Sequence, residues 1–485
     1  MHQHTSFLVA AFLLIQLSFA NTTIPSDQCI SHVFPCSNYI VGNLILTVLY
    51  GFTLAFAAKL ISDGAELLLD VGLPPALIGG AVLPVLGAIP DAAMIVASGL
   101  GSKEEAEEQI SVGMGTLAGS SILLLTLAWS ASLVFGKVDI IETPDQKPIG
   151  IDHTSTVSFF KQGVEVTAQV RVIIFGMIVT CLPYVIIQSN DFWGLDKSPK
   201  VTYLMWASGI SLVLCTLGFA GYIIWQIITA NEGENANIIK HEIIKDQNKM
   251  YHHAVRAFMA NKQFSGVKIH TDSQFARDHE TMLAQKYFNI WKNKTFKKQE
   301  VAVNVSSGSK DDDDDEEPRW KIGTKAGVFL TLGVGLVTFF SDPMCATLTA
   351  LTNKNYPQHI PISPFYLSFI VTPLCSNASE LISSLIFASK KEKSSSSVTF
   401  SQLYGAAVMN NTMCLGVFCV LILVRQLTWD FSAEISAILI TQLVVGVVAL
   451  FSGNVYRTTL VIPIALLYFF ALGLTAVLEN VFHWS

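Results

Sequence analysis

Apolar residues gather in ten long stretches along this chain, and a long polar segment divides them into two groups of five. A helix of about 20 residues crosses the hydrocarbon core of a bilayer, so each stretch predicts a transmembrane helix. The predicted spans are 41–62, 76–99, 111–135, 170–189 and 201–228 in the first half, and 322–341, 363–389, 402–424, 433–452 and 458–480 in the second.

Positive charge gathers in alternate loops. If residue 21 lies outside, segments 136–169, 229–321, 390–401 and 453–457 are cytosolic, and they hold most of the Lys and Arg. Cytosolic loops are enriched in these residues, although the long central loop carries little weight in the comparison. Because five is an odd number of crossings, the second half enters the membrane from the opposite side. We therefore predict an all-α membrane protein built from two inverted five-helix repeats.

Two spans share an unusual construction, in which a carboxylate follows a proline by seven residues. A carboxylate is expensive to bury in a bilayer, so a matched pair in two halves indicates a transported cation. The segments read Pro84-Val-Leu-Gly87-Ala-Ile-Pro90-Asp91 and Pro373-Leu-Cys-Ser376-Asn377-Ala-Ser379-Glu380.

Proline within a span predicts a helix break, because it lacks an N–H and clashes with the carbonyl four residues earlier. Irregular backbone at membrane depth is tolerated only inside the protein or along a water-filled cavity. The predicted breaks involve Pro84, Gly87, Pro90 and Pro373. The carbonyls released for a cation are expected to be those of Gly80, Leu86 and Phe369.

Oxygen ligands near the two acids favour Ca²⁺, which takes about six to eight of them, over Mg²⁺, which keeps its water, although Mg²⁺ is not excluded. Two carboxylates are neutralised by one Ca²⁺ or by two protons, which predicts antiport without a bound cofactor. Na⁺ competes for the same oxygens, so the coupling ion stays open between Na⁺ and H⁺. The expected cation-binding residues are Asp91, Glu380, Asn377, Ser376, Ser120, Ser121, Asn410 and Asn411.

Matching features recur at similar offsets in the two halves. Asp63 and Asp342 each follow the first span of their half, as gating or proton-relay groups or as solvated helix caps. Glycines also open the third helices of both halves, at Gly115 and Gly405. They fit a repeat, but they can equally be explained by close helix packing.

The first 20 residues form a short apolar segment that ends in Ser18-Phe-Ala20, which is typical of a cleaved signal peptide. The segment lacks Lys and Arg, so an uncleaved anchor is the alternative. The exported 21–40 segment contains the glycosylation sequon at Asn21 and the closely spaced Cys29 and Cys36, candidates for a disulfide. A chance sequon and two free thiols are the other interpretation.

Composition excludes a soluble domain, since 51% of the 485 residues are hydrophobic and 14% are charged. The net charge of −7 comes largely from the acidic run 311–317, and no nucleic-acid-binding pattern is visible. We expect membrane halves at 41–228 and 322–485, joined by a cytosolic regulatory or linker loop at 229–321. The acidic run predicts a solvated linker, with weak Ca²⁺ regulation as the alternative.

The motifs 87–93, 112–120, 376–380 and 409–412 together resemble the Ca²⁺/cation antiporter superfamily, most closely plant sodium/calcium exchanger-like proteins. The resemblance implies ten core helices, Ca²⁺ binding at the midplane by Asp91 and Glu380, and alternating access driven by Na⁺ or H⁺. It also implies a vacuolar or other endomembrane location, with the plasma membrane as the alternative.

Three departures from the family pattern matter. Plant relatives carry EF-hands in the central loop, and segment 229–321 has no such motif. Animal-type exchangers have Pro-Glu where this chain has Pro90-Asp91. They also carry a further acid where this chain has Asn410-Asn411. The missing third acid favours proton coupling over three-sodium coupling.

Other function classes fit the same acids less well. An antiporter of K⁺ or Mg²⁺ for H⁺ is the main alternative. An intramembrane enzyme also buries two carboxylates, but no zinc or serine-hydrolase motif supports it. A channel uses similar ligands, yet inverted repeats with broken helices are typical of alternating access. The partners expected are membrane lipid and inorganic cations, while protein partners stay open.

Overall fold

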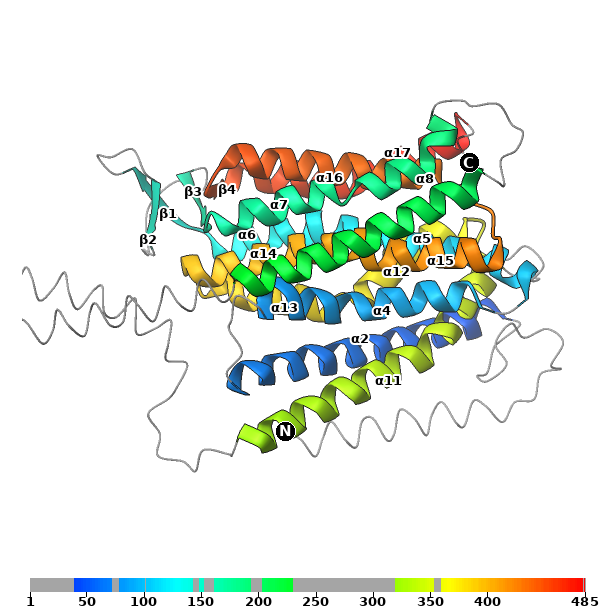
Figure 1. Ribbon diagram of the computed structural model, residues 1–485, viewed down its shortest axis with the longest axis horizontal. Coiled ribbons are helices and arrows are strands. Elements are labelled where there is room, and N and C mark those ends of the chain that lie inside the picture. Colours follow the sequence, from blue (N-terminus) through cyan, green and yellow to red (C-terminus); the bar gives the residue numbers. More distant parts are fainter. Residues whose placement is uncertain are drawn as a thin grey trace, which may run out of the picture. The chain divides into compact units, whose positions relative to one another are not determined.

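The computed structural model describes residues 39–71, 78–100, 102–142, 148–151, 161–192, 203–229, 319–352, 359–482 and 484 (Figure 1). The predicted signal peptide, Asn21, Cys29 and Cys36 lie outside the described residues, as does the 230–318 part of the central loop. The two membrane halves together form one compact unit.

The described residues of the first half form five apolar helical spans. Short π-helical turns, labelled η2 and η3, interrupt two of them. The elements are α2 (Ile40–Val71), η2 (Ile78–Val82), α4 (Leu83–Ser98), α5 (Lys103–Leu123), η3 (Leu124–Ala128), α6 (Trp129–Gly136), α7 (Gln169–Val179), α8 (Leu182–Phe192) and a helix over Tyr203–Thr229.

The second half repeats this order with a sharper bend in its second span. The elements are α11 (Arg319–Thr352), α12 (Pro364–Ser376), α13 (Ala378–Ser389), α14 (Lys393–Met409), the π-helical η5 (Asn410–Cys414), α15 (Leu415–Arg425), α16 (Ser432–Ser452), the 3₁₀ turn η6 (Thr458–Leu460) and α17 (Val461–Asn480). Within the described ranges, nine helices are long and apolar enough to cross a membrane, and the bent pair α12 and α13 supplies a tenth. The predicted ten spans are confirmed.

The bent pair crosses the membrane fully, and an ion pair supports this assignment. Glu165 follows the third span, and its carboxylate lies 2.5 Å from the ammonium group of Lys393, which follows the seventh. Two residues can meet at one membrane surface only if an even number of crossings separates them. If α12 and α13 formed a re-entrant loop, three crossings would separate these residues, so the pair must count as one crossing.

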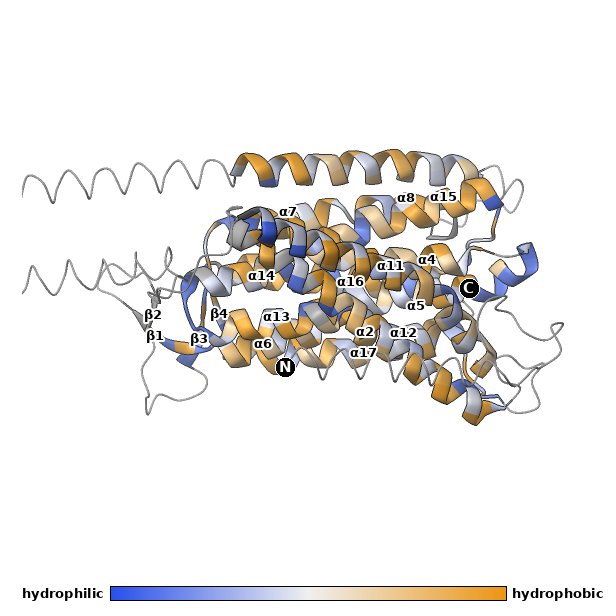
Figure 2. Cartoon of the chain, turned by 90° about the horizontal axis from the view of Figure 1, so that it is seen from below, coloured by the Kyte–Doolittle hydropathy of each residue, from blue (hydrophilic) through white to orange (hydrophobic). Residues whose placement is uncertain are grey.

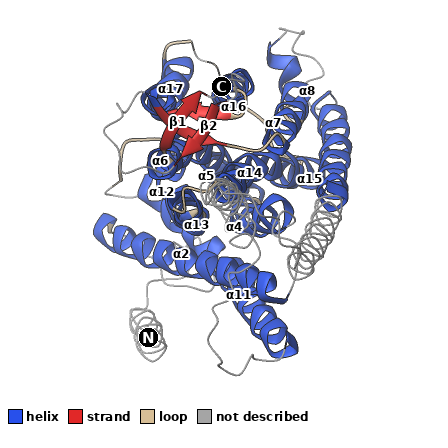
Figure 3. Ribbon diagram, turned by 90° about the vertical axis from the view of Figure 1, so that its left-hand side faces the viewer, coloured by secondary structure: helices blue, strands red, loops and turns tan. Residues whose placement is uncertain are grey.

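A small antiparallel sheet covers the same end of the bundle, beside α6 and α16 (Figure 3). Its strand order is β2-β1-β3-β4, and the strands are β1 (Val138–Glu142), β2 (Pro148–Ile151), β3 (Gln162–Glu165) and β4 (Val455–Arg457). This sheet could not be predicted from the sequence, because each strand is short and β3 pairs with a loop of the other repeat. Its pairing joins two loops that were both predicted to be cytosolic.

Buried aromatic side chains support the sheet from beneath. The indole Nε1 of Trp129 donates a hydrogen bond of 2.7 Å to the Tyr404 hydroxyl, and both side chains are fully buried. The ring of Tyr456 in β4 lies 5.4 Å from that of Trp129 and 4.9 Å from that of Phe400. These contacts tie the third span of each repeat to the sheet.

Hydrophilic residues gather at the two ends of the bundle, and hydrophobic ones cover its length (Figure 2).

The predicted proline breaks lie elsewhere in part. Pro84 stands at the start of α4, after the π-helical turn η2, while Gly87 and Pro90 lie inside the continuous helix. Pro373 likewise lies inside α12, and the chain bends by 55° in the break that contains Asn377. Irregular backbone therefore directly precedes Pro84 at η2 and follows Pro373 at Asn377, whereas α4 continues through Pro90.

Helices α2 and α11 lie side by side in Figures 1 and 3 and pack through glycine. A Cβ atom at Gly333 would lie 2.7 Å from Ile61 Cγ1 and 2.9 Å from the Ala57 carbonyl oxygen. In a bilayer, helices associate through close packing of this kind, so the glycine sets the distance between the two helix axes.

We expect Gly333→Val to lower the free energy of unfolding by about 1–3 kcal/mol, because the new methyl groups overpack the contact. Gly335→Val is the matched control, since a Cβ atom there meets no atom within 4 Å. Thermal unfolding of the purified protein in detergent measures the difference. Equal melting temperatures for the two variants would contradict this account of the α2–α11 contact.

Candidate functional site

The two carboxylates singled out by the sequence are both buried in the interior of the bundle. Asp91 lies in α4 with an exposed fraction of 1%, and Glu380 lies in the first turn of α13 with an exposed fraction of 5%. Asn377 separates α12 from α13, with φ −98° and ψ 16°, so Glu380 directly follows the irregular residue. The bend thus places a carboxylate beside backbone that has left the regular helical geometry.

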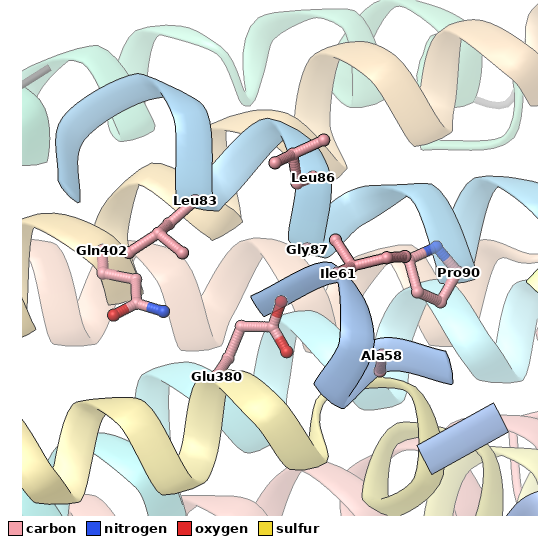
Figure 4. Close-up of a pocket in the computed structure, with 8 residues that line it drawn as sticks. All are labelled: Ala58, Ile61, Leu83, Leu86, Gly87, Pro90, Glu380 and Gln402. Atoms are coloured by element: carbon pink, nitrogen blue, oxygen red, sulfur yellow. The ribbon is translucent and has the colours of Figure 1, made fainter. Parts of the chain in front are cut away.

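Each acid lies against the helix of the opposite repeat. A Cβ atom at Gly87 would lie 1.9 Å from Glu380 Oε1, so the carboxylate occupies the space that a side chain there would fill. Figure 4 shows Glu380 pointing from α13 toward the α4 backbone at Gly87. In the converse contact, the side chain of Ser376, one helical turn before Glu380, adjoins Asp91. The two acids are therefore related by a crossed pair of contacts.

The Asp91 carboxylate has incomplete hydrogen bonding. The side chains of Ser376, Ser120 and Asn377 adjoin it, yet neither carboxylate oxygen has a partner of good hydrogen-bond geometry among the described residues. Asn377 Nδ2 instead donates to Ser120 Oγ at 2.8 Å and to the Pro373 carbonyl at 3.3 Å. Burying a charged carboxylate without compensation is costly, so this group requires a cation or a proton.

The third helix of each repeat adds polar side chains to the contact between the repeats. Asn410 begins the π-helical turn η5, and its Nδ2 donates to Ser121 Oγ at 3.1 Å. Ser120 and Ser121 are adjacent on α5, so the two serines accept from Asn377 and Asn410 respectively. This network joins α5 of the first repeat to both irregular segments of the second repeat.

Asn411 lies apart from the other predicted ligands. Its Nδ2 donates to Gln442 Oε1 at 2.7 Å, and Gln442 Nε2 donates back to Asn411 Oδ1 at 2.7 Å. Asn411 Nδ2 also contacts the Met177 carbonyl and Thr180 Oγ1. Its amide therefore connects η5 to α16 and α7, and the structure does not bring it together with the acids.

A small pocket lies beside Glu380, between it and residues of α2, α4 and α14 (Figure 4). Its walls are mostly apolar, and Gln402 of α14 adds one amide. Gln402 Nε2 donates to Ser383 Oγ at 3.0 Å, and Ser383 lies on the same helix as Glu380. The sequence analysis missed Gln402, because a lone amide in an apolar span carries no motif. The lining residues are Ala58, Ile61, Leu83, Leu86, Gly87, Pro90, Glu380 and Gln402.

Fewer backbone carbonyls face the acids than the prolines predicted. The Gly80 carbonyl, released from its helical bond by Pro84, accepts a hydrogen bond of 2.6 Å from the Tyr222 hydroxyl. The Phe369 carbonyl faces α5, where a Cβ atom at Gly119 would lie 2.3 Å from it. Two of the three expected carbonyls therefore contact other helices, which makes side-chain oxygens the stronger candidates for cation ligands.

The second pair of acids does not end its helices as predicted. Helix α2 continues beyond Asp63 to Val71, and α11 continues beyond Asp342 to Thr352. Asp63 Oδ2 lies 2.7 Å from Lys59 Nζ, one turn earlier on an exposed face. Among the described residues, no three His, Cys, Asp or Glu side chains group closely enough to hold a metal ion. The site therefore consists of two carboxylates supplemented by amides and hydroxyls, a set that suits a hard cation such as Ca²⁺.

We expect Gly87→Ala to weaken Ca²⁺-dependent stabilisation of the protein, because the added methyl group displaces the Glu380 carboxylate. A ligand at a hundredfold excess over its Kd stabilises the folded state by about 2.7 kcal/mol, which is readily measured as a thermal shift. Gly176→Ala is the control, since open space surrounds that position in α7. A full Ca²⁺-dependent shift in Gly87→Ala would show that the close approach is not required.

The chain is similar to known proteins over most of its length. Residues 42–228 and 325–479 match the sodium/calcium exchanger protein family. Sodium/calcium exchanger NCL1 of Oryza sativa subsp. japonica is 31% identical over an alignment covering 95% of this chain and 89% of that protein. Sodium/calcium exchanger NCL of Arabidopsis thaliana is 30% identical, with coverage of 93% and 88%.

A solved structure shares the fold. The crystal structure of the H⁺/Ca²⁺ exchanger CAX superposes with a TM-score of 0.52 and 14% identity, over 98% of this chain and 91% of that one. The family match spans both membrane halves and includes both buried acids. The chain belongs to the sodium/calcium exchanger family and is a multi-pass membrane antiporter of Ca²⁺ and other cations.

Proposed function

We propose that this protein exports Ca²⁺ from the cytosol in exchange for a monovalent cation, by alternating access around Asp91 and Glu380. The observation that carries the proposal is the crossed contact between the repeats. Glu380 reaches the backbone of α4 at Gly87, while buried Asp91 adjoins Ser376 and has no partner of good geometry in the described part of the chain. A cation held between these groups contacts both repeats at once.

The contact between repeats suits alternating access. Transporters built from inverted repeats move one repeat or bundle against the other around a central site. In this chain the acids come from α4 and α13, and the amides that brace them come from the bend at Asn377 and from η5. A relative movement of the two repeats therefore changes the access to the site without dismantling either helix.

The charge of the site supports protons as the coupling ion, with Na⁺ as the alternative. Two carboxylates carry a charge of −2, which one Ca²⁺ or two protons neutralise. A neutral site crosses a low-dielectric barrier more cheaply than a charged one. Three Na⁺ would leave a net positive charge, and the neighbouring Asn410 amide adds no compensating acid. Exchange of one Ca²⁺ for two protons is therefore our proposal.

The membrane is proposed to be a vacuolar or other endomembrane. This location follows from the likeness to plant exchangers that the two signature segments carry. In such a membrane, export from the cytosol fills an internal store. Localisation of a tagged full-length chain tests this part independently of transport.

We expect Asp91→Asn and Glu380→Gln each to abolish gradient-driven Ca²⁺ uptake into sealed vesicles, because each removes half of the site's charge. Glu434→Gln is the matched control. That carboxylate is also buried, at 5% exposed, but it lies at the start of α16 near Glu479. If uptake survives in both site variants, the proposed site is wrong. If native protein moves K⁺ or Mg²⁺ but not Ca²⁺, the proposed substrate is wrong.

For the coupling ion, we expect an imposed pH gradient to drive Ca²⁺ uptake more strongly than an equal Na⁺ gradient. Exchange of one Ca²⁺ for two protons moves no net charge, so the uptake rate should not change when a K⁺ gradient with valinomycin sets the membrane potential. Uptake that requires Na⁺ and responds to the potential would instead favour a sodium exchanger of higher stoichiometry.

A further inference from the structure

Cys414 brings a sulfur atom to the group of residues around Asp91. The side chain is fully buried in the π-helical turn η5. Its Sγ lies 3.6 Å from Asn410 Oδ1. The nitrogen of the same amide donates a hydrogen bond to Ser121 Oγ. The same Sγ lies 3.9 Å from the Ala88 carbonyl oxygen in α4. The thiol therefore connects the irregular turn of one repeat to the acid-bearing helix of the other.

The thiol also lies near the Asp91 carboxylate. Ala88 precedes Asp91 by three residues, and residues at this spacing share one face of a helix. Cys414 and Asp91 are close enough to interact electrostatically. Asp91 is 1% exposed, and neither of its oxygens has a partner of good geometry among the described residues. The sulfur atom of Cys414 thus lies between an amide oxygen of η5 and a backbone carbonyl of α4, on the helix that carries Asp91.

These atoms differ in the cations they prefer. Carboxylate and carbonyl oxygens suit hard cations such as Ca²⁺, whereas a thiolate binds soft metal ions. We propose that Cys414 and Asp91 together form a binding site for soft divalent cations, for which Cd²⁺ is the probe. On binding, the Sγ–H bond is replaced by an Sγ–Cd²⁺ bond, and the released proton passes to water.

Binding through sulfur changes the charge of the site. With Asp91, Glu380 and the Cys414 thiolate, the site carries −3, so Cd²⁺ leaves a net charge of −1. A charged site crosses the low-dielectric barrier less readily than a neutral one. Cd²⁺ therefore occupies the site and inhibits Ca²⁺ movement. The binding follows from the local geometry, while the inhibition rests on the proposed Ca²⁺ transport.

A second buried cysteine on the same span serves as a control. Cys419 lies in α15 just beyond Cys414, and its thiol contacts Cys215 of the helix over Tyr203–Thr229. It shares the burial and the chemistry of Cys414. Replacing Cys419 with serine therefore removes one buried thiol and leaves the contacts with Asn410 and Ala88 in place.

The binding test is a Cd²⁺ titration of the purified full chain, followed by the ultraviolet charge-transfer absorption of a Cd–thiolate bond. In the native protein and in Cys419→Ser, we expect part of this absorption to disappear when Ca²⁺ is added in excess. Cys414→Ser should lack the Ca²⁺-displaceable part. In Asp91→Asn, the Cd²⁺ affinity of this displaceable part should fall about tenfold or more, as loss of a metal contact lowers affinity. A displaceable absorption that persists in Cys414→Ser would overturn the proposal.

The transport test uses Cd²⁺ inhibition of Ca²⁺ uptake in vesicles. The Cd²⁺ concentration for half-inhibition should rise about tenfold or more in Cys414→Ser and Cys414→Ala, and stay unchanged in Cys419→Ser. Inhibition by Sr²⁺, a hard cation, should be equal in all four proteins. Equal Cd²⁺ sensitivity with and without Cys414 would refute the proposal that Cd²⁺ inhibits Ca²⁺ uptake through this thiol. If native protein moves no Ca²⁺, the proposed function fails. The thiol site is then decided by the Cd²⁺ titration without added Ca²⁺, in which one component of the absorption should be lost in Cys414→Ser and weakened in Asp91→Asn.

Discussion

The candidate site depends on one close approach between helices α4 and α13. It is possible because Gly87 of α4 has no side chain. Glu380 crosses from α13 to α4 because Gly87 offers no Cβ atom at the point of contact. The position of Glu380 follows in turn from the packing of α12 on α5. There, Cβ atoms at Gly115 and Gly119 would lie 2.6 Å and 2.3 Å from the carbonyl oxygens of Phe365 and Phe369. Helices in lipid gain little from hydrophobic burial against each other, so small residues and polar contacts decide how closely they approach.

This close packing explains how a pair of acids is tolerated at membrane depth. Polar neighbours from the opposite repeat brace the acids, as Asn377 and Asn410 bind Ser120 and Ser121. These amides and hydroxyls bond to one another, and within the described ranges neither oxygen of Asp91 has a partner of good geometry. A low-dielectric interior penalises an uncompensated charge strongly, so the protein is arranged to hold a counter-charge at this point. Ion exchange requires a carboxylate of this kind, because a carboxylate whose hydrogen bonds are all made within the protein gains less from binding a cation.

The sequence predicted the ten spans and the two acids, because hydrophobic length and a charge in an apolar stretch are visible in one dimension. It could not separate the roles of Asn410 and Asn411. Adjacent residues in a helix point about 100° apart, so only one of them can face the acids. Which one does depends on the π-helical turn that begins at Asn410. A turn of that kind inserts a residue into the helix and shifts the phase of all that follow.

The same reasoning accounts for the missed sheet and the displaced breaks. Strand β4 has three residues and pairs with β3, far away in the chain, so no local pattern announces it. Proline marks a missing hydrogen bond, but the neighbouring helices decide whether the chain bends there. At Pro90 the helix continues, and after Pro373 the bend waits until Asn377. Tertiary packing selects among local possibilities that the sequence leaves open.

The two crossed contacts are complementary in size, and this accounts for the unequal acids. Where the acid is long, as in Glu380, the facing residue Gly87 has no side chain. Where the acid is one methylene shorter, as in Asp91, the facing residue Ser376 carries a hydroxyl. Each contact therefore fills a similar space while keeping a carboxylate at the boundary between the repeats. The shorter acid of the first repeat is thus accommodated opposite a side chain, and the longer acid of the second repeat opposite a residue that has none.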